Sequence, residues 1–149
     1  MKLVFSRKGF DSSAGGFPSP IIDGKPISLP IPYRSSNVSY QHLDLGKVVK
    51  DLTGRKLTDK DLCHNDPDLE LGAFGQVSSA QSHLHNQSIG SGDLFLFFGW
   101  FREAEIVDCN YRYKSDATGH HRIFGWMFVN QKILVGSETE EFRREYSKY

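Results

Sequence analysis

The chain has 149 residues, of which 38% are hydrophobic and 24% charged; this composition fits a single soluble globular domain over residues 1–149 and excludes a disordered chain. Its 18 Lys and Arg residues balance 18 Asp and Glu residues, which argues against a whole-surface electrostatic grip on nucleic acid or an acidic membrane. Any anion site must therefore be local. The longest apolar run, residues 94–101, is far shorter than the roughly 20 residues that a membrane-spanning helix needs.

The first third of the chain predicts short strands and turns. Residues 2–6 form the first expected strand. Residues 7–20 contain three glycines and two prolines, which favours a structured loop. Two Ile-containing segments, residues 21–22 and 27–31, flank Asp23-Gly24 and predict a hairpin, whose prolines should confine it to a sheet edge.

The middle of the chain predicts helices separated by polar loops. Residues 45–52 have a helical rhythm that ends before Gly54, and Thr58 to Asp61 is typical of a capped turn. Residues 64–68 should form a polar loop. Residues 73–87 place their apolar side chains at helical spacing and predict a second helix.

The last third predicts most of the sheet. Residues 93–101 are almost wholly apolar and predict a buried central strand. Residues 106–113 and 121–134 are two further expected strands, the latter bent at Gly125. A last helix is expected over residues 138–148, where acidic residues precede basic ones as the helix dipole favours.

The two cysteines predict the compartment of the protein. Cys63 and Cys109 lie far apart in the sequence, and no charged-then-apolar leader precedes them. We therefore expect free thiols and a reducing, cytoplasmic location.

Two long blocks of sequence carry a family resemblance. The segment SRKGFDSSAGGFPSP after the first strand, the block HNDPDLELGAFGQVSSAQSHLHNQSIGSGDLFLFFGWFR and the later RIFGWMFV together resemble the third of the nucleotide-modification-associated domains. This family was defined beside phage and bacterial systems that alter DNA bases, and the likeness covers most of residues 1–130. The resemblance implies a connection to modified nucleotides. It also implies a shortened member, since such domains often continue beyond the position of Tyr149.

A fainter likeness concerns the fold. The segments Gly92-Asp93-Leu94-Phe95 and Ile123-Phe124-Gly125-Trp126 are similar in order to a strand pair of PUA-like barrels, which include the ASCH domains. The expected fold class is therefore α+β, with a mixed or antiparallel sheet or pseudo-barrel and a few flanking helices.

The glycine-rich loop is the candidate anion site. Glycines allow close backbone approach, hydroxyls donate hydrogen bonds, and Arg binds phosphate with two parallel hydrogen bonds. The candidate ligands are Arg7, Lys8, Ser12, Ser13, Gly15 and Gly16. The loop lacks the residue order of a P-loop, so magnesium and a nucleoside triphosphate are not implied. The alternative is a rigid surface loop with solvated charges.

Three residues are candidate acid or base catalysts. Asp11 lies in the glycine-rich loop, where it could accept a proton or close an Asx turn onto Ser13. His64 and Asp66 are close in sequence, and Pro67 would fix their presentation. The alternative for this second pair is an Asx-Pro turn. No residue order identifies a reaction, so enzymatic activity on a nucleobase or nucleotide remains one hypothesis.

A cluster of amides beside an aromatic strand is the candidate base pocket. Amide side chains pair with the edge of a base, and an aromatic ring stacks on its face. The candidates are Gln76, Gln81, His83, Trp100 and Arg102. The alternative is that the amides face solvent and the aromatic side chains fill the core. The six histidines lack the spacing of a metal site, so neither a metal nor another cofactor is expected.

These observations favour a domain that handles a nucleotide or a modified nucleobase, free or within DNA, and that is not membrane-bound. One alternative is a non-catalytic reader or a sponge for a nucleotide signal. A second alternative is a structural partner domain without a ligand.

Overall fold

The computed structural model describes residues 1–64, 66–76, 78–133, 140 and 144. These residues form a mixed six-stranded sheet and two short helices, so the expected α+β class is confirmed. In chain order the elements are β1 (Leu3–Arg7), β2 (Ser19–Ile22), β3 (Lys25–Pro26), α1 (Gly46–Leu52), α2 (Ser78–Asn86), β4 (Leu94–Val107), β5 (Asn110–Tyr113) and β6 (His120–Phe128).

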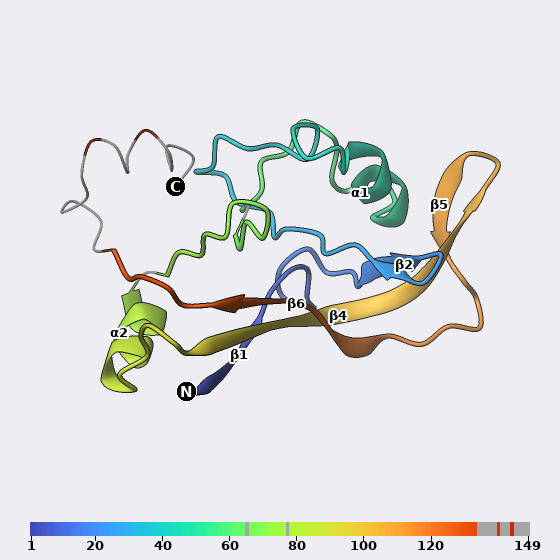
Figure 1. The fold of residues 1–149 in the computed structure, drawn as a ribbon. Helices are drawn as coiled ribbons and strands as arrows, with labels where there is room; N and C mark the ends of the chain where they lie inside the picture. Colours follow the sequence, from blue (N-terminus) through green and yellow to red (C-terminus); the bar gives the residue numbers. More distant parts are fainter. Residues whose placement is uncertain (65, 77, 134–139, 141–143, 145–149) are drawn as a thin grey trace.

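The long strand β4 is the axis of the sheet (Figure 1). On one edge, β1 pairs in parallel with its first part and β2 in parallel with its middle part. On the other edge, β6 and then the hairpin strand β5 pair with it in antiparallel fashion. The sheet made by the described residues does not close into a barrel, so the mixed open sheet is the form observed. In the same part of the chain no helix is long and apolar enough to cross a membrane.

Several predicted elements are confirmed, with shifted ends. Strand β1, helix α1 and the hairpin at Asp23-Gly24 are present, and both hairpin residues adopt the positive φ (50° and 77°) that a two-residue turn requires. The expectation that this hairpin lies at the sheet edge is wrong for β2, which lies between β4 and β3. Pro20 has no backbone N–H to donate. It fits there because its carbonyl still accepts a hydrogen bond from the amide of Ile27.

Two other boundaries differ from the predictions. Residues 106–113 are a hairpin and not one strand, because Asp108 and Cys109 have positive φ (49° and 62°) and form the turn between β4 and β5. Helix α2 begins at Ser78 and not at residue 73. A bend was predicted at Gly125, and the register of β4 and β6 shifts beside this residue. The helix predicted over residues 138–148 falls almost entirely outside the described residues.

The core consists of two clusters on the covered side of the sheet. The first packs α1 and the loops before it around Phe10 and Tyr40, whose rings meet edge to face at 6.3 Å. The second contains Ile89, Phe95 and Phe97. Both clusters draw on β4, which therefore connects the two ends of the molecule.

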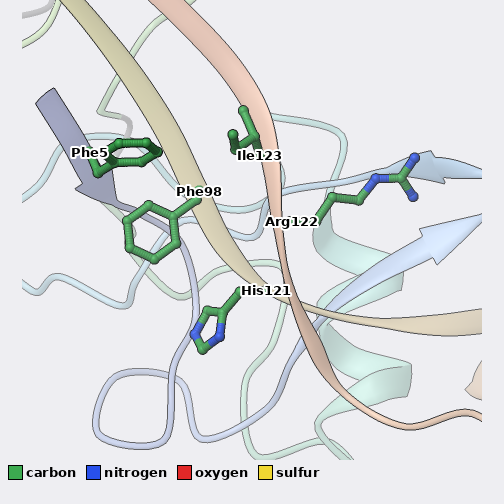
Figure 2. A pocket seen from close by; sticks show the side chains of 5 residues that line it. All are labelled: Phe5, Phe98, His121, Arg122 and Ile123. Carbon is green, nitrogen blue, oxygen red and sulfur yellow. The ribbon is translucent and has the colours of Figure 1, made fainter. Parts of the chain in front are cut away.

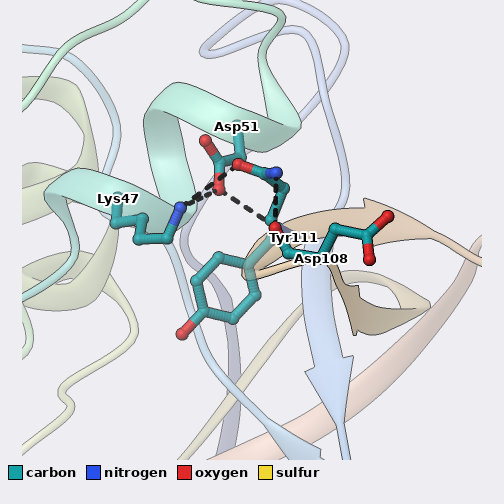
Figure 3. Close-up of polar contacts among 5 residues, drawn as sticks. Lys47, Asp51, Asp108 and Tyr111 are labelled. Atoms are coloured by element: carbon teal, nitrogen blue, oxygen red, sulfur yellow. Dashed lines mark hydrogen bonds and ion pairs between the residues drawn. The ribbon is translucent and has the colours of Figure 1, made fainter.

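Helix α1 is fixed to the β4–β5 hairpin by polar contacts (Figure 3). The carboxylate of Asp51 accepts hydrogen bonds from the Lys47 ammonium (2.9 Å) and from the backbone amide of Tyr111 (3.1 Å).

Cys63 is buried in the first cluster and Cys109 is exposed at the hairpin turn, and the predicted free thiols are confirmed. Burial raises the pKa of the Cys63 thiol to about 11, so this group is not a nucleophile at neutral pH.

Candidate functional site

The first half of β4 has one buried and one uncovered side. Side chains of successive strand residues point to opposite faces of a sheet. On the inner face Phe95, Phe97 and Phe101 are buried. On the opposite face every second residue, from Leu94 to Trp100, is only partly buried. The strand predicted to be buried on both sides is therefore covered on one side by the described residues.

Strand pairing extends this uncovered surface, here called the open face, across three strands. The register places its residues in four rows: row 1 is Leu3, Leu94 and Phe128; row 2 is Phe5, Leu96 and Trp126; row 3 is Arg7, Phe98 and Ile123; and row 4 is Trp100 and His121. Phe5 and Trp126 are each 62% exposed and Ile123 is 51% exposed. A contiguous apolar surface of this kind marks an interaction site in a soluble protein.

The open face contains a shallow hollow of about 250 Å³ (Figure 2). Its lining residues are Phe5, Phe98, His121, Arg122 and Ile123. The Phe5 and Phe98 rings meet edge to face at 6.5 Å, and the Phe98 ring meets the His121 ring at 5.8 Å. In Figure 2 the Arg122 side chain points away from these rings. The hollow therefore offers a floor of aromatic rings contributed by β1, β4 and β6.

The neighbouring candidates Arg7 and Lys8 lie on opposite faces of the sheet. Arg7 belongs to row 3 of the open face; its side chain is 55% exposed and forms an ion pair with Asp11 at 2.9 Å. Lys8 lies on the covered side, where its ammonium is 3.2 Å from the Asp66 carboxylate and 4.3 Å from the centre of the Phe74 ring. Of these two residues, only Arg7 therefore lies on the face that contains the hollow.

The glycine-rich loop holds its own anion. One oxygen of the Asp11 carboxylate accepts hydrogen bonds from the Ser13 amide (2.8 Å), the Ser13 hydroxyl (2.8 Å) and the Ala14 amide (2.7 Å). These bonds, with that from the Ser13 hydroxyl foremost, lower the pKa of Asp11. The Gly16 amide donates to the Asp11 carbonyl. The Asx turn onto Ser13 is thus present, and its donors are occupied by Asp11.

The conformation of the loop explains why glycine occurs at positions 15 and 16. Gly15 has φ of +88°, and a Cβ atom there would lie 2.4 Å from the buried Phe10 ring. Gly16 also has positive φ, +77°, with open space around it, and Ser12 is exposed in the turn. The loop is therefore a tight turn seated on the first core cluster. Its use as a backbone cradle for an external anion stays a prediction.

The candidate catalysts have separate partners. His64 is exposed, and its ring meets the Tyr33 ring at 5.3 Å. The Asp66 side chain is only 4% exposed, and its two oxygens accept hydrogen bonds from the Lys8 ammonium and the Gly75 amide. Neither residue, nor Asp11, is among the residues that line the hollow.

The candidate residues for the base pocket lie in different parts of the structure. Trp100 lies on the open face, with Gly119 so close to its indole that a Cβ there would be 2.3 Å from Nε1. Gln81 and His83 are exposed on α2, which packs through Leu84 against the second core cluster, and Gln76 is partly buried before the helix.

Arg102 lies in the middle part of β4, where β2 pairs with this strand. Its guanidinium donates to the Lys114 carbonyl at 3.0 Å and lies over the Tyr113 ring, while its Nε has no hydrogen-bond partner. Lys8, at the start of the glycine-rich loop, contacts Phe74 just before α2, whereas Phe10 of the loop packs in the first cluster and Leu84 of α2 in the second. A pocket that joins the loop to the amides of α2 stays a prediction.

The family model of nucleotide modification associated domain 3 matches residues 2–148. The chain belongs to this family. The resemblance seen in the sequence is thereby confirmed, and it links the chain to nucleotide modification. Comparisons with curated proteins and with solved structures found no match.

In this member of nucleotide modification associated domain 3, sequence reasoning missed Phe5, Phe98, His121 and Ile123. One signal was available. Residues 94–101 are apolar on both faces of a strand, and covering both faces requires two layers, whereas only a few helices were predicted. The described part of the chain contains no cluster of three or more His, Cys, Asp or Glu residues suited to a metal.

Proposed function

We propose that the chain is a nucleotide-binding domain that holds a base on the open face, against the rings of Phe5 and Phe98, with the phosphate on Arg7. The observation that carries this proposal is that Phe5 and Phe98 line one hollow with their rings edge to face, and that Arg7 lies two residues after Phe5 on the same face of β1, opposite Phe98 in the register. Aromatic rings stack on or contact any base, and a guanidinium binds phosphate with two hydrogen bonds.

The size of the hollow supports a planar ligand. Pockets that enclose small molecules have volumes of roughly 300–1,000 Å³. The hollow is smaller, at about 250 Å³, and open to solvent. Such a shape suits one base that lies on a surface, and it suits a modified base, because a substituent on the ring edge would extend into solvent.

The ion pair between Arg7 and Asp11 does not block this role. The Arg7 side chain is more than half exposed, and exposed ion pairs contribute about 1 kcal/mol or less. A ligand phosphate, with two negatively charged oxygens, competes for the same guanidinium. Asp11 would then stay in its turn, because its hydrogen bonds to Ser13 and Ala14 are independent of Arg7.

Binding without catalysis is the reading that the side chains favour. Asp66 is engaged by Lys8 and Gly75, Asp11 is held in its turn, and His64 lies outside the hollow. A reader of a modified base, or a protein that sequesters a nucleotide, needs only the binding surface.

Calorimetric titration with the common nucleoside monophosphates tests the proposal. We expect Arg7→Ala to weaken binding by about tenfold, because a charge-assisted contact contributes roughly 1.5–3 kcal/mol. The matched control is Arg112→Ala, since the Arg112 side chain is similarly exposed (61% against 55%) and ion-paired to Glu105, and neither of these two residues lines the hollow. Phe5→Ala should also weaken binding, with the exposed Tyr33→Ala as its control. Equal affinities for Arg7→Ala, Phe5→Ala and their controls would refute the proposal.

A further inference from the structure

The aromatic surface of the open face continues beyond the hollow. Trp126 and Phe128, in rows 2 and 1, are 62% and 46% exposed, and their rings meet edge to face at 5.7 Å. Neither residue lines the hollow. A single nucleotide bound at the hollow would leave this second aromatic pair unused.

On β4 the rows are two residues apart, and on β6 the register shift puts Trp126 and Ile123 three residues apart. Residues two apart in a strand are separated by about 6.6 Å, so the four rows extend over about 20 Å. Every row contains at least one aromatic ring: Phe128, then Phe5 with Trp126, then Phe98, then Trp100. The open face is therefore a series of stacking positions and not one isolated ring.

The charge of the face selects an anionic partner. Among the residues of the four rows, Arg7 is a cation, His121 is the other titratable side chain, and there is no Asp or Glu. Asp11, outside the rows, pairs with Arg7, and Arg122 also lines the hollow. Two arginines against one carboxylate complement a ligand that has flat rings and negative charge. An apolar protein partner would have no need of the arginine.

We propose that the open face binds a short single-stranded nucleic acid laid along the strands, with its bases stacked on successive rows and one phosphate on Arg7. This inference rests on the proposed nucleotide binding and extends it from one base to a strand. Unpaired bases expose their faces to aromatic side chains, whereas the bases of a duplex stack on one another. The zero net charge agrees with a short segment, because a long duplex footprint needs many cations.

The length of the ligand gives the first test. Fluorescence anisotropy with labelled thymidine monophosphate, oligothymidylate tetranucleotide and a fully paired DNA hairpin measures the three affinities. We expect the tetranucleotide to bind at least about tenfold more tightly than the mononucleotide, and the hairpin to bind more weakly than the tetranucleotide. Equal affinities of the mononucleotide and the tetranucleotide would overturn the inference and leave the single-nucleotide proposal intact. Failure of all three ligands to bind would overturn both.

The Trp126→Ala variant distinguishes binding of a single-stranded nucleic acid from binding of a single nucleotide. This variant should lose about fivefold or more in affinity for the tetranucleotide, because a stacked base contributes roughly 1–3 kcal/mol, and should keep its affinity for the mononucleotide. Tyr33→Ala is the control, since Tyr33 is an exposed aromatic residue outside the sheet.

Sedimentation of the wild type and of Trp126→Ala tests whether a second copy of the chain occupies the open face. A wild-type dimer that the substitution converts to a monomer, with unchanged tetranucleotide affinity, would overturn the inference.

Salt dependence tests the role of Arg7. One phosphate contact on a single strand predicts a slope of about −0.7 for the logarithm of the binding constant against the logarithm of the salt concentration. Arg7→Ala should bring that slope close to zero, whereas Trp126→Ala should leave it unchanged. A wild-type slope several times steeper would contradict the single-phosphate arrangement.

Discussion

The glycine-rich loop and the open face of the sheet use their side chains in opposite ways. The loop contains the residue types that suggest chemistry, and its carboxylate, hydroxyl and amides bind one another around Asp11. The open face consists mostly of apolar side chains, which suggest a core, and it exposes Phe5, Ile123 and Trp126. The polar groups around Asp11 already have hydrogen-bond partners within the loop, whereas the apolar side chains of the open face remain exposed to solvent.

This difference teaches where a ligand can gain free energy. A polar group that already has partners gives little to a ligand, since binding only exchanges one hydrogen bond for another. An exposed ring gains roughly 25 cal/mol for each Å² that a ligand removes from water. The apolar face is therefore the better candidate site, although its residues carry no recognisable catalytic pattern.

The largest expected effect compares the two sides of the sheet. Phe97 is fully buried on the inner face, so Phe97→Ala should lower the free energy of unfolding by about 3–5 kcal/mol. Phe5 lies mostly in solvent on the open face, so Phe5→Ala should change it by about 1 kcal/mol or less. Urea denaturation measures both. Similar losses for the two variants would show that the open face is covered in solution.

A smaller effect concerns the loop. Asp11→Ala removes the acceptor of three hydrogen bonds and should lower the free energy of unfolding by about 1–3 kcal/mol. Nucleotide affinity should not fall, because the substitution also frees the Arg7 guanidinium from its ion pair. A stable Asp11→Ala protein that has lost nucleotide binding would return the site to the loop.

The smallest expected effect is a pH dependence. The pKa of Asp11 is lowered in the folded protein by the hydrogen bonds of Ser13 and Ala14 and by Arg7, so its ionised form stabilises the fold. That contribution is present above the unfolded pKa, near 4, and is lost as the pH falls through the lower folded pKa. The free energy of unfolding should therefore fall more between pH 6 and pH 3 in the wild type than in Asp11→Asn. The lowered carboxyl pKa values of Asp51 and Asp93 are common to both proteins and cancel in the difference. Parallel pH curves would contradict this role of Asp11.

Local sequence patterns predicted much of the fold. The turn at Asp23-Gly24 and helix α1 follow from local backbone preferences, and each was found. The register shift of β6 lies beside Gly125, where a bend was predicted. The turn at Asp108-Cys109 was missed because neither residue is a glycine or asparagine, although both adopt positive φ.

The candidate site was harder to predict because it depends on pairing between distant strands. Arg7 and Trp100 were both proposed as ligand residues, and the register of β1, β4 and β6 puts them on one face. The same register sends Lys8 to the other side, where Asp66 pairs with it. A pattern of neighbouring residues does not reveal which face remains uncovered, since that depends on how much chain is available to cover it.

Methyl NMR of the isoleucines tests the central claim most directly. Ile123 lines the hollow, whereas Ile106 is similarly exposed (54%) on β4 outside it. During titration with a nucleoside monophosphate we expect a ring-current shift of the Ile123 δ1 methyl and none at Ile106 or at the amides of Gly15 and Gly16. Shifts of the two glycine amides with an unmoved Ile123 methyl would place the ligand in the loop and contradict the account.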